Sequence, residues 1–96
     1  MIESVIDWAE KKGIINNATP RDQMLKVVEE VGELADALGK GNNDLIADAI
    51  GDITITLIIQ ARLCGLDYEE CVSSALDEIL GRSGKMINGI FVKDTK

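Results

Sequence analysis

The sequence contains no histidine, one proline, two cysteines and three aromatic residues among its 96 residues. Without histidine, a His-based zinc site, a histidine general base and a Ser-His-Asp triad are all excluded. Two cysteines cannot make a zinc site alone, and we expect Cys64 and Cys71 to be reduced, buried thiols. Because aromatic residues are so few, the core must consist of Ile, Leu, Val, Ala and Met, a mixture that suits packed helices.

Positive charge is also scarce, since 10 Lys and Arg stand against 17 Asp and Glu and the net charge is -7. This balance argues against binding to a nucleic acid polymer or to an anionic membrane surface, because both need clustered Lys and Arg. If the protein binds phosphates, a divalent metal held by carboxylates is the simplest source of positive charge. No signal peptide or transmembrane segment is evident, so we expect a cytoplasmic protein.

A chain of 96 residues has room for one core, and we expect a single domain over residues 1–96. A long apolar segment in the middle of the chain would be hard to cover within so small a subunit. We therefore expect a homo-oligomer, either a homodimer or a homotetramer.

Four segments have helical character, over about 2–12, 19–38, 43–65 and 67–81. Thr19 followed by Pro20, and Asp67 followed by Glu70, are typical of helix N-termini. In the tail, over residues 85–96, Asn88-Gly89 predicts a small hairpin or a loop.

Apolar patterning indicates which helices lie inside. The third segment is apolar on most sides and should be central, although the alternation from Ile53 to Leu57 would also suit a strand. We interpret it as helix because the pattern before and after it is helical. The second segment carries a stripe that we expect in the core: Met24, Val27 or Val28, Val31, Leu34, Ala35 and Leu38.

Five carboxylates are clustered on the second and third segments. Glu29, Glu30 and Glu33 lie on the second, and Asp48 and Asp52 lie on the third. Spacings of three or four residues bring side chains onto one helical face, and a short turn between the two helices would let the two acidic groups face each other. Such a cluster repels itself unless a cation lies within it, so the pattern predicts a metal site in a helical bundle.

The same acids could also form the solvated face of ordinary surface helices. The position of Asp52 between Ile50 and Ile53 favours a site, because a charge in apolar surroundings is usually paired or bound to a metal.

The run EEVGELA from Glu29 to Ala35, followed after a turn by DAIGD from Asp48 to Asp52, resembles the MazG-like all-α nucleoside triphosphate pyrophosphohydrolases. Their signature is EExxE followed by ExxD. Two further stretches are similar to the C-terminal portion of short, phage-type members, and the resemblance spans roughly Leu25 to Val92. These stretches are Arg82 with Gly84-Lys85-Met86, and Asn88-Gly89-Ile90-Phe91-Val92.

The resemblance implies an all-α fold, a four-helix bundle with a short C-terminal tail that is completed by oligomerisation. It implies hydrolysis of a ribo- or deoxynucleoside triphosphate to the monophosphate and pyrophosphate, with Mg²⁺ as cofactor and Mn²⁺ as a substitute. Glu30, Glu33 and Asp52 would be metal ligands, and Glu29 would be an outer ligand or would orient the attacking water. Ala49 stands where the glutamate of ExxD is expected, and Asp48 could supply the missing oxygen.

Three further residues are candidates for substrate binding. Arg82 and Lys85 could bind the phosphates, or they could be a solvated basic cluster near a helix C-terminus. Trp8 could stack on the base, or it could belong to the core, as a lone Trp among Ile and Val often does.

Two alternatives to a nucleoside triphosphate pyrophosphohydrolase stay open. A phosphoribosyl-ATP pyrophosphohydrolase would use the same carboxylates, and only its substrate would distinguish it. A non-catalytic helical oligomerisation module would carry the acids on its surface or around a structural cation.

Overall fold

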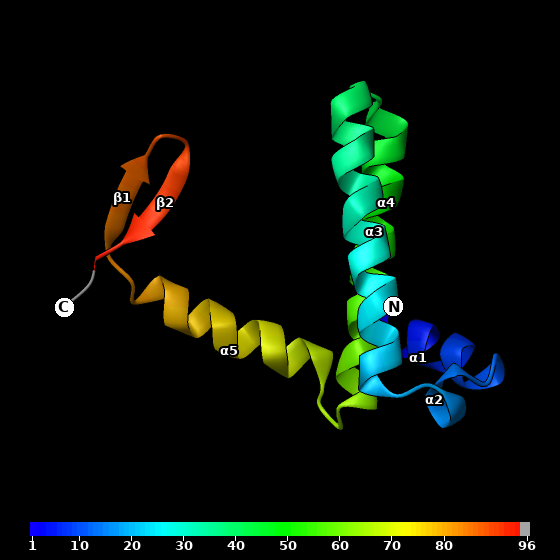
Figure 1. Ribbon diagram of the computed structural model, residues 1–96. Coiled ribbons are helices and arrows are strands. Elements are labelled where there is room, and N and C mark those ends of the chain that lie inside the picture. Colours follow the sequence, from blue (N-terminus) through cyan, green and yellow to red (C-terminus); the bar gives the residue numbers. More distant parts are fainter. Residues whose placement is uncertain (95–96) are drawn as a thin grey trace.

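A computed structural model describes residues 1–94, which form five helices and one β-hairpin (Figure 1). The expected all-α fold with a short C-terminal tail is confirmed, and Asn88-Gly89 does form a hairpin turn. Residues 95 and 96 of the predicted tail lie outside the described residues. The elements are α1 (Ile2–Lys11), α2 (Ile14–Asn17), α3 (Pro20–Lys40), α4 (Asn43–Leu63), α5 (Tyr68–Leu80), β1 (Gly84–Ile87) and β2 (Ile90–Lys93).

Side-chain caps begin the three long helices. The Thr19 hydroxyl accepts a hydrogen bond from the Asp22 amide, and the Asp22 carboxylate accepts one from the Thr19 amide, which completes a capping box at α3. The Thr19 amide accordingly holds the pKa of Asp22 below its ordinary value. Asn42 caps α4 and Asp67 caps α5, each through a side-chain oxygen. The helix starts predicted at Thr19 and Asp67 are confirmed, whereas the short α2 was not predicted.

Helices α3 and α4 form a long antiparallel pair, which Figure 1 shows side by side. Buried Gln23 of α3 donates a hydrogen bond to the carbonyl oxygen of Thr56 on α4, at 3.1 Å. Gln60 of α4 donates another to the carbonyl oxygen of Pro20, also at 3.1 Å. These bonds lock the register of the pair, and the register decides which carboxylates of α3 lie opposite those of α4.

Helix α4 is the central element, as expected, because α1, α2, α3 and α5 all contact it. Its segment from Ile53 to Leu57 is helical and not a strand. The buried hydrophobic residues belong to α1, α3 and α4, and they are Ala9, Val27, Ala37, Ala49, Ile58, Ile59 and Ala61.

The predicted core stripe of α3 is only partly confirmed. Val27 is buried and Leu34 is half-buried, but the other members, Met24, Val28, Val31, Ala35 and Leu38, are exposed. The prediction was wrong for them because apolar periodicity marks a face that avoids water without showing what covers it. Cys64 and Cys71 are free, but both are exposed, so their expected burial was wrong too.

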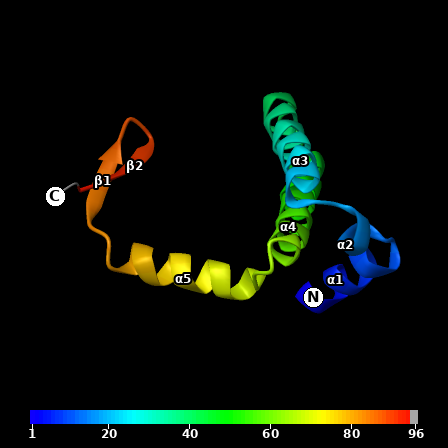
Figure 2. The same cartoon turned by 60° about the horizontal axis from the view of Figure 1, so that its bottom comes forward.

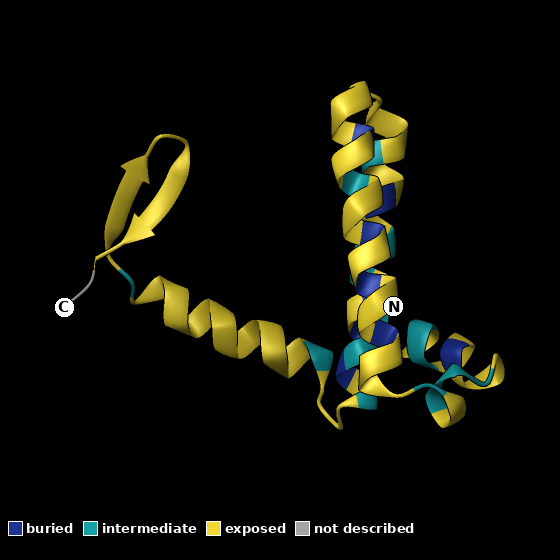
Figure 3. Cartoon of the chain, viewed as in Figure 1, coloured by how far each residue is buried: buried dark blue, intermediate teal, exposed yellow. Residues whose placement is uncertain are grey.

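The C-terminal part projects from the helical body, and we refer to residues 68–94 as the arm (Figures 1 and 2). Helix α5 leaves α4 at a bend of 104°. At its end β1 and β2 pair antiparallel, with Gly84 opposite Lys93 and Ile87 opposite Ile90. Within the arm only Tyr68 and Arg82 are half-buried, and every other residue is exposed (Figure 3).

Among residues 1–94, no single helix is both long enough and apolar enough to cross a membrane. Helices α4 and α5 taken together, with the bend between them, meet that test by length and composition.

Candidate functional site

Glu30 is the buried carboxylate of α3. Its residue is only 9% exposed, and it lies on the side of α3 that faces α4. Burial raises the pKa of Glu30, and the negative charges of Glu33 and Asp52 raise it further. Asp52 lies on α4, so its effect on the pKa of Glu30 connects the acidic residues of the two helices. Asp52 of α4 is therefore near enough to Glu30 for their charges to interact, whereas the meeting of both acidic groups around a cation stays a prediction.

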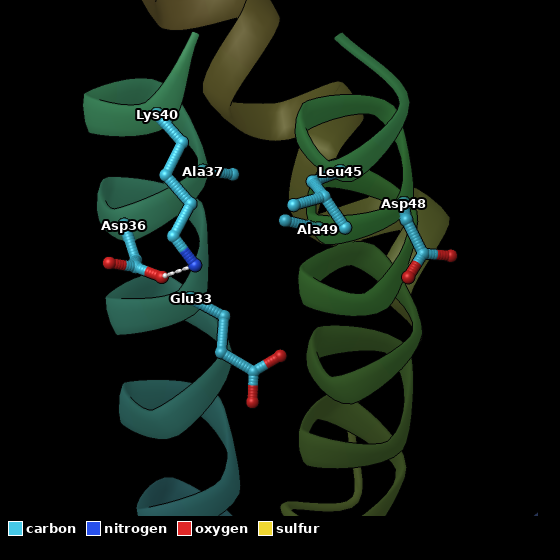
Figure 4. A pocket seen from close by; sticks show the side chains of 7 residues that line it. All are labelled: Glu33, Asp36, Ala37, Lys40, Leu45, Asp48 and Ala49. Carbon is cyan, nitrogen blue, oxygen red and sulfur yellow. Dashed lines mark ion pairs between the residues drawn. The ribbon is translucent and has the colours of Figure 1, made fainter. Parts of the chain in front are cut away.

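Glu33 and Asp48 line a hollow of about 260 Å³ between the upper halves of α3 and α4 (Figure 4). In Figure 4 the Glu33 side chain extends from α3 toward α4, and Ala49 contributes only a methyl group to the lining. Asp48 is exposed, whereas Ala49 is buried. The position at which the ExxD motif has glutamate thus borders open space. In Figure 4 the Asp48 side chain lies on the side of α4 away from Glu33, so its replacement of that glutamate stays a prediction.

Asp52 is half-buried one helical turn along α4 from Asp48, and it borders a second hollow of about 530 Å³. Four residues rise about 6 Å along a helix, so Asp52 lies about that far along α4 from Asp48. Apart from Asp52, the second hollow is lined by Met1, Ser4, Val5, Trp8 and Ile55. Trp8 is 49% exposed, so it is not a core residue. An apolar pocket with an aromatic side chain and a carboxylate at its edge suits a base or another flat ligand.

Two lysines lie among the carboxylates of α3. Lys26 forms a 3.0 Å ion pair with Glu29, which raises the pKa of Lys26. Lys40 pairs with Asp36 at 3.0 Å on the wall of the first hollow, as Figure 4 shows. Sequence reasoning missed both pairs. Their spacings of three and four residues were the available signal.

Arg82 and Lys85 belong to the arm and are not brought to the carboxylates of the same chain (Figure 2). Arg82 forms a 2.8 Å ion pair with Glu78, one turn back on α5. Lys85 lies on β1 and pairs in register with Val92. Binding of phosphates by these two residues stays a prediction.

The carboxylates lie near one another without forming a finished cluster. Among residues 1–94 no three Asp, Glu or Cys side chains are gathered closely enough to hold a metal ion. The donor set nevertheless suits a hard divalent cation, because all the available ligands are carboxylate oxygens. Burial, and then the charges of Glu33 and Asp52, raise the pKa of Glu30, and a bound cation would favour its charged form.

Comparison with known proteins identifies the family to which this acidic helical pair belongs. The family model of the MazG nucleotide pyrophosphohydrolase domain matches residues 18–87, which include α3, α4 and all five carboxylates. The chain belongs to the MazG family. MazG proteins are nucleotide pyrophosphohydrolases and generally use a divalent metal. The match begins after Trp8, so the base pocket rests on the geometry of this chain alone.

One relative is an uncharacterized 18.2 kDa protein in the rep-hol intergenic region of Haemophilus phage HP1 (strain HP1c1). It is 34% identical to the MazG chain over 67 residues, which are 70% of this chain and 41% of the phage protein. The chain therefore spans less than half the length of this relative.

Proposed function

We propose that this protein hydrolyses a ribo- or deoxynucleoside triphosphate to the monophosphate and pyrophosphate, with Mg²⁺ held by Glu30, Glu33 and Asp52. One observation carries the proposal. Glu33 and Asp48 line one hollow, and Asp52, one helical turn along α4 from Asp48, borders an apolar hollow that contains Trp8. The first suits a metal with phosphates, and the second suits a base.

The balance of charge requires a cation for this reaction. A triphosphate would be repelled by five carboxylates, and the two lysines nearby are already paired with Glu29 and Asp36. Bound Mg²⁺ would neutralise charge on the phosphates and on the leaving pyrophosphate. Asp48, which lines the first hollow, supplies a further carboxylate where Ala49 has none.

The side chains then position the substrate and the water. The apolar hollow around Trp8 would bind the base, which places the α-phosphorus near the acidic pair of helices. Glu29 would orient the water that attacks the α-phosphorus in line. A new P–O bond forms there as the bond from the α-phosphorus to the oxygen that bridges to the β-phosphate breaks. Pyrophosphate leaves with that oxygen, and the proton lost by the water passes to solvent.

The test is pyrophosphate release from a panel of ribo- and deoxynucleoside triphosphates and phosphoribosyl-ATP, with Mg²⁺, with Mn²⁺ and with a chelator. We expect monophosphate and pyrophosphate in equal amounts, and no turnover in the chelator. Release of inorganic phosphate instead, or no product from any substrate, would reject the proposal. Turnover of phosphoribosyl-ATP alone would support the proposed pyrophosphohydrolase reaction but show that phosphoribosyl-ATP is the substrate.

A further inference from the structure

Lys40 differs in charge from the acidic residues around the first hollow. Of the described residues that line this hollow, Lys40 alone is cationic, whereas Glu33, Asp36 and Asp48 are acidic. Helical side chains lean toward the N-terminus of their helix, and the Lys40 ammonium lies 3.0 Å from Asp36 Oδ2, one turn back along α3. Figure 4 shows the Lys40 side chain running back along α3 toward Glu33. The ammonium group therefore lies at the hollow in which the proposed function places the phosphates.

The ion pair with Asp36 contributes little to the stability of the fold. Both side chains are mostly exposed, at 62% for Lys40 and 68% for Asp36, and water and salt screen exposed pairs of this kind. An ammonium group has three N–H donors, so Lys40 can contact Asp36 and a further anion at once. Stability gives no reason for a lysine at this position, whereas an anionic ligand does.

The order of residues along the two helices gives the substrate a direction. On α4, Asp52 and Ile55 border the hollow that contains Trp8, whereas Leu45, nearer the turn between α3 and α4, borders the first hollow. Lys40 lies at the same turn, because it is the last residue of α3. With a base beside Trp8 and the α-phosphate at the carboxylates, the direction away from the base leads toward this turn. The β- and γ-phosphates then extend toward Lys40.

We propose that Lys40 binds the β- and γ-phosphates, which leave as pyrophosphate, and thereby selects nucleoside triphosphates over nucleoside diphosphates. This assignment rests on the proposed function. The three residues from Glu33 to Asp36 rise about 4.5 Å along α3, a step similar in size to a pyrophosphate group. An ammonium group at that level forms charge-assisted hydrogen bonds with the terminal phosphate oxygens. A diphosphate is one phosphate shorter, so it loses most of this contact.

The first test is calorimetric binding in the presence of Mg²⁺. The probes are the non-hydrolysable α,β-imido analogues of the four common deoxynucleoside triphosphates and of the matching diphosphates. For the triphosphate analogue that binds best, Lys40→Met should raise the dissociation constant by about tenfold or more, because a charge-assisted hydrogen bond is lost. The matching diphosphate should change by less than about twofold. Lys40→Arg keeps the positive charge and should restore most of the affinity.

The matched control is Lys11→Met. Lys11 forms an exposed ion pair with Asp7 at 3.0 Å on α1, again four residues apart, and Asp7 borders a different hollow. The control removes the same kind of pair, so it should leave the affinities for both classes of analogue unchanged. A loss of triphosphate affinity in Lys11→Met as large as that in Lys40→Met would overturn the assignment.

Asp36→Asn separates binding of a ligand from a role in the ion pair. It breaks the pair with Lys40 but keeps the ammonium group and removes a nearby negative charge, so triphosphate analogues should bind at least as tightly as to the wild-type protein. If Lys40 acted only through its ion pair, Asp36→Asn and Lys40→Met would weaken binding equally, and the proposal would be wrong.

The remaining outcomes separate this assignment from the proposed reaction. Unchanged triphosphate affinity in Lys40→Met would reject the contact with phosphates, and equal losses for triphosphates and diphosphates would reject the selection, even if the wild-type protein hydrolyses triphosphates. If the wild-type protein binds the analogues but hydrolyses no triphosphate, the reaction is wrong, and the affinities still decide the role of Lys40. Failure of the wild-type protein to bind any analogue would overturn both.

Discussion

The two faces of the α3–α4 pair differ in what they need from outside the chain. One face carries five carboxylates with few cations, and burial and neighbouring charge raise the pKa of Glu30 there. The opposite face carries apolar side chains that are left exposed within residues 1–94. A cation would satisfy the first face, and a protein surface would satisfy the second. Because acidic and apolar side chains lie on separate faces of one helical pair, the two faces should respond to different sets of substitutions.

The largest expected effect is on the acidic face. Glu33→Gln and Asp52→Asn should lower kcat/KM by about a hundredfold to a thousandfold, because each removes a charged ligand from the cation and the transition state. Asp48→Asn should lower kcat/KM by about tenfold, because Asp48 would supply the carboxylate oxygen that Ala49 lacks. Steady-state pyrophosphate release measures all three effects.

The matched controls are Glu69→Gln and Asp77→Asn on α5, which make the same chemical changes on the arm. They should keep full activity. Equal losses in the variants of α3 and α4 and in the controls would remove the distinction between the two faces.

The next largest effect is expected at the contact between α3 and α4. Gln23→Leu should lower the free energy of unfolding by about 1–3 kcal/mol, because the buried hydrogen bond from Gln23 to the Thr56 carbonyl is lost. Gln60→Leu should cost less, since the Oε1 atom of Gln60 is buried without a partner within residues 1–94. Urea unfolding at fixed chain concentration measures both. If Gln60→Leu lowered the free energy of unfolding more than Gln23→Leu, the hydrogen bond of Gln23 would not be the stronger of the two between α3 and α4.

The apolar pocket beside Asp52 should affect binding more than chemistry. Trp8→Ala should raise KM about tenfold and change kcat little, because stacking on a base stabilises substrate and transition state alike. Trp8→Phe should restore most of the loss. A fall in kcat with KM unchanged would show that Trp8 does not bind the base.

The smallest effect concerns the stability of the metal-free protein. The folded state raises the pKa of Glu30, so it holds that proton more tightly than the unfolded state does. Stability from this group is therefore present below the ordinary pKa of glutamate and is lost as pH rises through the raised value.

Glu30→Gln should remove that loss and raise the thermal midpoint at neutral pH by roughly 2 °C in a chelator. Glu69→Gln, which is exposed, is the control and should leave the midpoint unchanged. A lower midpoint for Glu30→Gln would mean that the charge of Glu30 stabilises the metal-free fold.

Local chemistry explains what the sequence could predict. Thr19 and Asp67 cap helices wherever they precede a helical segment, and three- and four-residue spacing places carboxylates on one face whatever the fold. The facing of α3 and α4 also followed, because the turn between them is short. The EExxE run with Asp52 identified the family that the match over residues 18–87 then established.

Long-range packing explains what could not be predicted. The α3 stripe was expected in the core, yet the fold of one chain leaves Met24, Val28 and Val31 exposed. Periodicity contains no information about which surface covers a stripe. The 104° bend that separates the arm from α4, and with it Arg82 from the carboxylates, depends on packing and not on local pattern.

The most direct test of the acidic face is calorimetric titration of the chain with Mg²⁺ in the absence of nucleotide. We expect saturable binding to the wild-type protein, binding weaker by about tenfold or more in Asp52→Asn, and unchanged binding in Asp77→Asn. Equal Mg²⁺ affinity in all three proteins would contradict the claim that the carboxylates of α3 and α4 form a metal site.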